Sequence, residues 1–334
     1  MSSSTASTTL APLVPEHSAQ AVSAPTSTAV LARCLLSLLP LRHGKHRLVD
    51  RTALKRLPIA DGLVRCAYAG RVLHIDPNDL VGRHFFLVGS FDPEVIDVLL
   101  AAAAGPEVLW DVGANAGTCS YAMAARLPTA RVVAFEPQRR LARLVHRNLC
   151  QFRGLGFEVF DVALSTSAGT ARLHVPEGNS GKASLHGDAA APGQEVQIAT
   201  AEDARRASRF GWPTLVKIDV EGHELEVLRT LRPAFAEQKI KAVVFEHHRN
   251  ASRSLMETAA PALEAGLDLF AIRKSAFRTD LHPVTSDVPG SVTDFVALRP
   301  ETVDRVLKNL RIGKNKDDDA IHRTAPEGRV PHRS

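Results

Sequence analysis

The sequence has few cysteines and few aromatic residues, and it contains no long hydrophobic run. Its 4 cysteines are scattered and include no Cys-x-x-Cys pair, which argues against a zinc site and a disulfide framework and favours a reducing, cytoplasmic compartment. No segment reaches the roughly 18 uninterrupted apolar residues that a membrane-spanning helix needs. The closest, residues 30–41, carries Arg33 and Pro40. It is predicted to form a short helix on the body of the protein, with a weak membrane-surface or partner contact as the alternative.

The composition that remains is that of a globular protein. The chain has 334 residues, of which 45% are hydrophobic and 23% charged, and this excludes a wholly disordered or fibrous chain. Its 41 basic and 36 acidic residues give a net charge of +5, which permits an anionic partner without requiring one. We divide the chain into a disordered tail (1–28), a helical and β-stranded extension (29–91), an α/β domain (92–300), and a C-terminal helix with a disordered tail (301–334).

Short apolar runs alternate with segments of helical periodicity from residue 92 onward. Such alternation is typical of parallel strands covered by helices on both faces of a sheet. The last two strand candidates, 267–273 and 293–298, are joined by a polar loop and are expected to pair antiparallel at one edge. The pattern predicts an α/β, doubly wound, mostly parallel, Rossmann-like sheet of seven strands with an antiparallel edge strand. The other five strands are expected over residues 108–112, 131–136, 158–164, 215–219 and 241–246, and shorter strands upstream over 63–68, 72–75 and 85–88.

A glycine-rich turn follows the first strand of this domain. The strand ends in Asp111 and continues through Gly113, Asn115 and Gly117 directly into a helix, with the spacing D-x-G-x-N-x-G. Glycine lets the backbone bend sharply and approach a ligand closely, and open α/β sheets bind ligands at the carboxyl ends of their strands. A carboxylate at Asp111 would repel a pyrophosphate but suits a ligand that carries an ammonium and a sulfonium group. S-adenosylmethionine meets that description, and Asn115 is expected to hydrogen-bond its amino-acid portion.

The next two strands also carry acids at or near their ends. Glu136 ends the second strand and is expected to accept hydrogen bonds from both ribose hydroxyls. On the third strand, Asp161 is expected to accept from the adenine amino group, and Ala163 or Leu164 to pack on the ring. The alternative is that Asp111, Glu136 and Asp161 only cap the helices that follow them. Their occurrence on three successive strands, together with the glycine-rich turn, favours a cofactor site.

These segments resemble the FkbM family of S-adenosylmethionine-dependent methyltransferases. The resemblance covers roughly residues 85–300 and is carried by residues 111–117, 135–137, 163–165 and 215–228, the last with the distinctive Lys-Ile-Asp-Val-Glu-Gly run. It implies a class I methyltransferase fold, S-adenosylmethionine as cofactor, and O-methylation of a hydroxyl on a saccharide or other natural product. Residues 200–203 depart from the Thr-Leu-Asp that the family usually carries after a strand.

Methyl transfer to a hydroxyl needs an acceptor oxygen held in line and a nearby base. Asp219 ends the fourth strand, at the same sheet edge as Asp111, and is predicted either to act as the base or to hold the acceptor hydroxyl. Glu221 is a candidate to assist it, with the alternative that it only stabilises a helix N-terminus. His247, just past the end of the next strand, is the third catalytic candidate. Lys217 is expected to pair with a carboxylate.

A metal ion is not expected at this site. Glu246, His247 and His248 could be imagined as ligands, but neighbouring residues on a strand point to opposite faces, so the two histidines cannot easily share one ion. The polar loop 178–184 is expected either to close over the site, with Asn179 and Ser184 touching cofactor or acceptor, or to be an ordinary surface turn.

Two other functions stay open at this stage. The first is a methyltransferase acting on RNA or protein, suggested by a pI near 9.2 and the Arg-rich segment 139–143. The second is a non-catalytic scaffold that binds the cofactor. No basic patch interleaved with aromatic residues supports a nucleic-acid partner, so a small-molecule or saccharide acceptor is preferred. The identity of the acceptor and the oligomeric state are not determined by the sequence.

Overall fold

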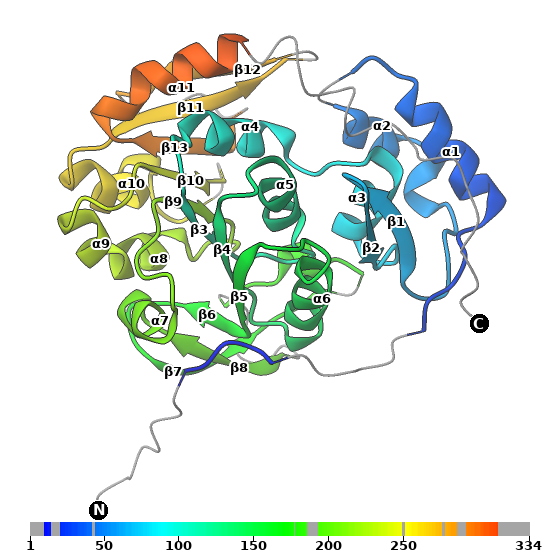
Figure 1. Ribbon diagram of the computed structural model, residues 1–334, viewed down its shortest axis with the longest axis horizontal. Coiled ribbons are helices and arrows are strands. Elements are labelled where there is room, and N and C mark those ends of the chain that lie inside the picture. The colour runs from blue at the N-terminus through cyan, green and yellow to red at the C-terminus, as the bar shows by residue number, and fades with distance from the viewer. Residues whose placement is uncertain are drawn as a thin grey trace, which may run out of the picture.

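Eight strands form the central sheet in the part of the chain that the computed structural model describes, which is residues 10–14, 21–41, 44–176, 178–185, 193–248, 251–275, 278–285 and 292–312. They are β3 (Val108–Val112), β4 (Arg131–Phe135), β5 (Gly156–Phe160), β9 (Leu215–Ile218), β10 (Ala242–Glu246), β11 (Asp268–Lys274), β12 (Thr279–Pro283) and β13 (Asp294–Leu298). Their order is β12-β11-β13-β10-β9-β3-β4-β5 (Figure 1). The five from β5 to β10 run parallel, and β13 pairs antiparallel with both β10 and β11.

Helices cover both faces of this sheet because its central strands are apolar on both sides. Leu109 and Val132 pack in one hydrophobic cluster, whereas the adjacent Trp110 and Val133 pack in a second. This alternation follows from the two-residue period of a strand. The first cluster includes α4 (Pro93–Ala102), α5 (Thr118–Arg126), α6 (Arg139–Leu149) and α11 (Pro300–Ile312); the second includes α7 (Ala201–Ala207), α8 (Glu224–Thr230), α9 (Arg232–Ala236) and α10 (Leu255–Glu264) (Figure 1). The predicted doubly wound α/β sheet is confirmed.

Two details of the predicted sheet are wrong. The run 158–164 divides at a bend at Asp161 into β5 and β6 (Val162–Leu164). Strand β6 leaves the central sheet and joins a small sheet of order β6-β8-β7, in which β7 is Gly169–Leu173 and β8 is Gln194–Ala199. The polar loop before the last strand contains β12, so the sheet has eight strands rather than seven. The predicted antiparallel pairing of the last two strand candidates, β11 and β13, is confirmed, and the antiparallel edge is also present, with β12 as the edge strand.

Residues 85–88 are helical, although a strand is predicted there. They end helix α3 (Leu80–Val88), because Asp79 caps the first turn by accepting from the Val81 backbone N–H at 3.1 Å, and Gly89 ends it in a left-handed conformation. A run of four apolar residues is compatible with either a buried strand or a buried helix, so the sequence pattern could not distinguish them.

The segment ahead of the α/β domain packs beside α6. Strands β1 (Val64–Tyr68) and β2 (Arg71–Ile75) form an antiparallel hairpin, close to the predicted strands. The Asn148 side chain of α6 accepts from the His74 backbone N–H and donates to the His74 carbonyl, both at 2.8 Å, which attaches the hairpin to the domain. The short helices of this segment are α1 (Ser27–Ser37), α2 (Lys45–Arg51) and η1 (Ala53–Arg56).

Parts of the N-terminal tail contact the body of the protein, contrary to the expectation of disorder. The Leu13 backbone N–H donates to the Val159 carbonyl at 2.7 Å, and Val22 forms a β-bridge with Leu63. The rest of the predicted tail at residues 1–9 and 15–20, and the predicted C-terminal tail at 313–334, lie outside the described residues. None of the helices within the described ranges combines the length and apolarity that crossing a bilayer would require.

The chain reverses its progress across the sheet between β3 and β9. From β3 it moves outward to β4 and β5, and from β9 it moves the other way to β10. Connections on the two sides of such a point diverge and leave a crevice beyond the carboxyl ends of the strands, which is where open α/β sheets bind their ligands. The fold therefore locates the candidate site before any side chain is considered.

Candidate active site

A cavity of about 360 Å³ lies at the carboxyl ends of β4, β3, β9 and β10. Its size falls in the range of small-molecule sites, roughly 300–1,000 Å³. Its position agrees with the crevice expected between β3 and β9. The ionisable side chains on its wall are Asp92, Glu136, Lys182, Lys217, Asp219, Glu221, His223, Glu246, His248, Lys274 and Asp294, together with the Cys119 thiol.

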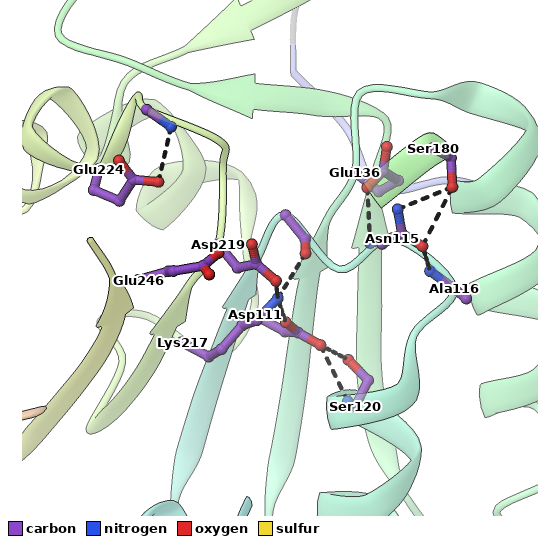
Figure 2. Close-up of polar contacts among 12 residues, drawn as sticks. Asp111, Asn115, Ala116, Ser120, Glu136, Ser180, Lys217, Asp219, Glu224 and Glu246 are labelled. Atoms are coloured by element: carbon purple, nitrogen blue, oxygen red, sulfur yellow. Dashed lines mark hydrogen bonds and ion pairs between the residues drawn. The ribbon is translucent and has the colours of Figure 1, made fainter. Parts of the chain in front are cut away.

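Glu136, directly after β4, is a buried carboxylate that can accept hydrogen bonds beyond the two that it receives from the backbone. Its Oε2 accepts from the Asn115 backbone N–H at 2.8 Å (Figure 2). Its Oε1 accepts from the Gln138 backbone N–H at 2.9 Å. A carboxylate oxygen has two lone pairs, so each oxygen retains one further acceptor position. Burial raises the pKa of Glu136 to about 7, although both backbone hydrogen bonds act to lower it. This carboxyl lies where a pair of ligand hydroxyls could be bound.

An apolar wall adjoins Glu136. Phe135, Val162, Ala163 and Leu164 all line the cavity there, so Ala163 lies in the predicted place. Asp161 does not line it. The bend that carries Asp161 out of β5 directs its carboxylate toward Arg139, 3.5 Å away, at the start of α6. The predicted contact of Asp161 with an adenine amino group is therefore not supported by its position.

The glycine-rich turn brings β3 and β9 together. Gly113 has φ +75°, and a Cβ added there would overlap the backbone carbonyl oxygen of Asp219. Only glycine therefore permits this close approach, which is to the neighbouring strand end rather than to a ligand. Gly117, at φ +79°, precedes α5 and packs against the Tyr121 ring without lining the cavity. Asn115 lines the cavity, and its backbone also has a positive φ, +49°.

A polar loop lies over this turn, as one of the two predictions for residues 178–184 proposes. The Asn115 side chain donates to the Ser180 hydroxyl at 3.1 Å, and the Ser180 backbone N–H donates to the Asp79 carboxylate at 2.7 Å (Figure 2 shows the first contact). Asn179 lines the cavity, whereas Ser184 donates to the Glu221 carbonyl at 2.9 Å. Ser180, which begins η2 (Ser180–Lys182), is the loop residue that sequence reasoning did not single out.

Lys217 links the ends of β3 and β9. Its ammonium group donates to the Gly113 carbonyl at 2.8 Å and lies 3.2 Å from Asp219 Oδ2 and 3.6 Å from Asp111 Oδ1 (Figure 2). Burial alone would lower the pKa of Lys217, but the Asp219 and Asp111 carboxylates raise it above its usual value. Lys217 is therefore charged, and the prediction that it pairs with a carboxylate is confirmed.

Asp111 lies beneath the cavity rather than on its wall. Its side chain is fully buried and does not line the cavity. Oδ2 accepts from the backbone N–H of Ser120 at 3.1 Å and from its hydroxyl at 2.6 Å, which orients the first turn of α5. The predicted direct contact of Asp111 with the ammonium group of a cofactor is thus not supported. Asp111 instead holds Lys217, which in turn contacts Asp219 on the cavity wall.

Acidic groups crowd the end of the cavity near β10. Asp219 is held by Lys217, and Glu246 points toward it from the end of β10 (Figure 2). Burial, followed by the negative charges of Asp219, Asp294 and Glu221, raises the pKa of Glu246 to about 9. Asp219 and Glu221 both line this end, as predicted for the catalytic candidates.

The structure places His248, not His247, on the cavity wall. The Nδ1 of His247 lies 3.3 Å from the Thr258 hydroxyl of α10, and its ring meets Phe295 edge-on. His247 therefore faces the helix layer, because consecutive residues at a strand end point in opposite directions. The predicted catalytic role of His247 is not supported, and the neighbouring histidine takes its place at the site.

Several cavity residues were not predicted as site residues from the sequence. Asp92 and Asp294 come from opposite ends of the domain sequence, and only the sheet order, which places β13 beside β10, brings Asp294 to this edge. Asp92 precedes the helix α4 and has a left-handed backbone with φ +44°. The one sequence signal that could have identified it is its place within the span of roughly 85–300 over which the chain resembles the family.

The chemistry of these groups fits S-adenosylmethionine. Glu136 is a carboxylate acceptor for ribose hydroxyls beside an apolar wall that suits an adenine ring. Asp219 supplies negative charge two strands away from Glu136, on the far side of β3, where a sulfonium and an ammonium group would be stabilised. The site thus carries complementary groups for each part of the ligand.

A family model and a curated relative agree with this chemistry. Residues 111–265 match the family model described as the methyltransferase FkbM domain. Hexuronic acid methyltransferase AglP of Haloferax volcanii is 30% identical over 207 residues, covering 60% of this chain and 81% of that protein. Among solved structures, precorrin-6y C5,15-methyltransferase from Geobacter metallireducens GS-15 is 14% identical with a TM-score of 0.37, covering 62% of this chain and 87% of that one. Magnesium protoporphyrin IX methyltransferase from Synechocystis PCC 6803 is 9% identical with a TM-score of 0.35, covering 62% and 77%.

Proposed function

Since this chain belongs to the FkbM family of S-adenosylmethionine-dependent methyltransferases, we propose that it methylates a hydroxyl group of a saccharide. The acceptor class is supported by the Haloferax relative, which is named for methylation of a hexuronic acid. The observation that carries the proposal is the position of Glu136 and Asp219 on the wall of one cavity, on either side of β3. One carboxylate suits an adenosine ribose and the other suits the reacting end of the methyl donor.

Glu136, Asn115 and the apolar wall would hold the cofactor. Glu136 would accept from the ribose hydroxyls, and Ala163 and Leu164, which line the cavity, would pack against the adenine ring. Asn115, fixed by its contact with Ser180, is within the cavity for the amino-acid portion. When bound, S-adenosylmethionine supplies a methyl group already activated by the sulfonium charge. The chain's remaining task is to position the acceptor oxygen in line with that group.

Asp219 is the residue that we assign to the acceptor hydroxyl. Lys217 holds the Asp219 carboxylate by its ion pair at 3.2 Å, so the group has a defined orientation on the cavity wall. A hydroxyl is a weak nucleophile while it keeps its proton, and a carboxylate that accepts this proton during transfer raises its reactivity. As the acceptor oxygen is methylated, Asp219 would take up the proton that the hydroxyl loses. Glu221, two residues later, lines the same end of the cavity.

The acceptor class is tested with purified protein and S-adenosylmethionine carrying a labelled methyl group. Uronic-acid oligosaccharides, neutral oligosaccharides, RNA and a protein mixture are offered separately. We expect label in a saccharide fraction that survives mild alkali, because a methyl ether is stable there and a methyl ester is not. Alkali-labile label would move the reaction to a carboxyl group, and label only in RNA or protein would contradict the proposed acceptor.

Binding of S-adenosylmethionine is expected to weaken as the pH falls through 7. The pKa of Glu136 is raised to about 7 by burial, and the ionised form is the better acceptor for two hydroxyls. If only that form binds, the Kd rises about tenfold between pH 8 and pH 6. Titration calorimetry across this range measures the effect. Glu136→Gln should bind more weakly at every pH with a flat profile; a flat profile in the unaltered protein would contradict the assignment.

We also propose a reducing, cytoplasmic compartment for this reaction. All four cysteines are free thiols, two of them buried and two exposed. Exposed free thiols are easily oxidised in secretory compartments, where disulfides form and persist. Fractionation of cells producing the tagged protein tests the compartment, and recovery of the protein in an oxidising compartment would overturn it.

A further inference from the structure

Two carboxylates and one imidazole converge on the cavity wall near Asp219. The His248 Nε2 atom lies 3.6 Å from Glu221 Oε2 and 3.4 Å from Glu246 Oε1. No two of the three potential ligand atoms are more than 4.8 Å apart. Glu221 follows β9, whereas Glu246 and His248 come from the end of β10, so the parallel pairing of these two strands assembles the group.

We propose that Glu221, Glu246 and His248 bind a divalent transition-metal cation such as Mn²⁺ or Zn²⁺. Two metal–ligand bonds of about 2.1 Å at a tetrahedral angle place their donor atoms about 3.4 Å apart. The two separations from His248, 3.6 and 3.4 Å, are close to this value, so small side-chain shifts bring all three atoms to one ion. An imidazole nitrogen beside carboxylates suits transition ions better than Mg²⁺ or Ca²⁺, which prefer all-oxygen ligand sets.

The surrounding charge also favours a cation. Six carboxylates and three lysines line the cavity among the described residues. Two of these lysines each pair with one cavity carboxylate and with one carboxylate that does not line the cavity: Lys217 with Asp219 and Asp111, and Lys274 with Asp294 and Glu94. All six cavity carboxylates except Glu136 act on one another near Glu246, and a divalent ion would offset their mutual repulsion.

The expectation of no metal ion rests on a different set of residues. Two adjacent histidines cannot share one ion, and His247 does face α10. The proposed set uses only His248 and draws its third ligand, Glu221, from the neighbouring strand end. Sequence spacing could not reveal this combination, because Glu221 and Glu246 are 25 positions apart and meet only through strand pairing.

The group lies at the acceptor end of the cavity. Strands β4, β3, β9 and β10 are successive neighbours, and at about 4.8 Å a strand the end of β10 is about 14 Å from the end of β4. The proposed metal site is therefore separated from Glu136 by about the length of the methyl donor, S-adenosylmethionine. If the proposed function holds, open positions on the ion would bind and polarise the acceptor oxygen. Cation binding itself does not depend on that function.

The test is a titration of metal-free protein with Mn²⁺ in the absence of cofactor and acceptor. Binding is measured from the loss of the electron paramagnetic resonance signal of the free ion. We expect one ion per chain, displaced by Zn²⁺. His248→Ala and Glu246→Gln should each weaken Mn²⁺ binding at least tenfold. His247→Ala is the matched control, since it removes the adjacent imidazole that faces Thr258, and it should leave Mn²⁺ affinity unchanged.

The proposal is overturned if the unaltered protein does not bind Mn²⁺, or if His248→Ala binds it as tightly as the unaltered protein. His248 has 48% of its side chain exposed, so its removal should not disturb the core, and circular dichroism verifies the fold. If Glu246→Gln does not fold, the comparison of His248→Ala with His247→Ala is sufficient to test the proposal. Because the signal reports ion binding only, its failure is distinct from a failure to methylate a saccharide.

Discussion

Replacing Asp219 by Asn is expected to lower kcat by about 10²–10⁴-fold, the range typical of losing a positioned acid–base group. The amide keeps the size of the carboxylate but cannot take up the hydroxyl proton. Affinity for S-adenosylmethionine should fall by less than about tenfold, because the variant loses the charge that Asp219 offers the sulfonium and ammonium groups but keeps Glu136 and the apolar wall. Single-turnover methyl transfer measures the chemical step, and calorimetry measures the cofactor affinity.

A matched control for this variant is Asp280→Asn on β12. Asp280 is a partly exposed carboxylate paired with Arg278 at the far edge of the sheet, and it does not line the cavity. Its kcat should stay within about twofold of the unaltered protein, as for most surface changes. If Asp219→Asn retains a kcat within fivefold of the unaltered enzyme, Asp219 is not the proton acceptor, and Glu221 becomes the next candidate.

Replacing Lys217 by Met is expected to destabilise the fold by about 3–5 kcal/mol, the usual cost of removing one partner from a buried ion pair. The substitution leaves the fully buried Asp111 carboxylate with only the hydrogen bonds from Ser120, and frees the Gly113 carbonyl from its donor. Asp219 contributes less to this loss, since 30% of its side chain is exposed and water can screen its charge. Urea unfolding of both proteins at neutral pH gives the difference in free energy of unfolding.

Combining Lys217→Met with Asp111→Asn separates charge from packing. The double variant no longer buries an unpaired carboxylate, so it should regain at least half of the lost stability. Its methyl transfer should stay impaired, because Asp219 would still lack the ammonium group that orients it. If Lys217→Met alone lowers the free energy of unfolding by less than about 1 kcal/mol, the ion pairs of Lys217 with Asp111 and Asp219 do not contribute substantially to stability.

The site residues divide into those that local sequence could locate and those that it could not. Glu136 and Asp219 each end a strand, and the position of a residue at a strand end is read directly from the apolar run before it. Asp111 lies one residue before the end of β3 at Val112, and it points below the cavity toward α5. The sequence pattern does not specify which side of the sheet edge a terminal side chain takes, and this depends on the turn that follows.

The bend at Asp161 illustrates the second limit. The apolar run 158–164 has the pattern of one strand, yet the chain leaves the central sheet in its middle. The local sequence does not require the chain to leave the sheet at Asp161, because the apolar residues before and after it would be buried in either sheet. The choice depends on β8, which pairs with β6 and lies more than 30 positions further along the chain.

By itself, the sequence determined the class of fold, the edge of the sheet that binds the ligand, and the methyl-donor cofactor. These follow from local properties: the period of the apolar residues, the glycines that allow a tight turn, and the acids placed at strand ends. Tertiary structure alone decided that His248 rather than His247 faces the cavity, that Asp111 acts through Lys217, and that Asp294 reaches the same wall. These depend on strand pairing and side-chain direction, which join residues that are distant in the chain and leave no mark in the spacing of any one segment.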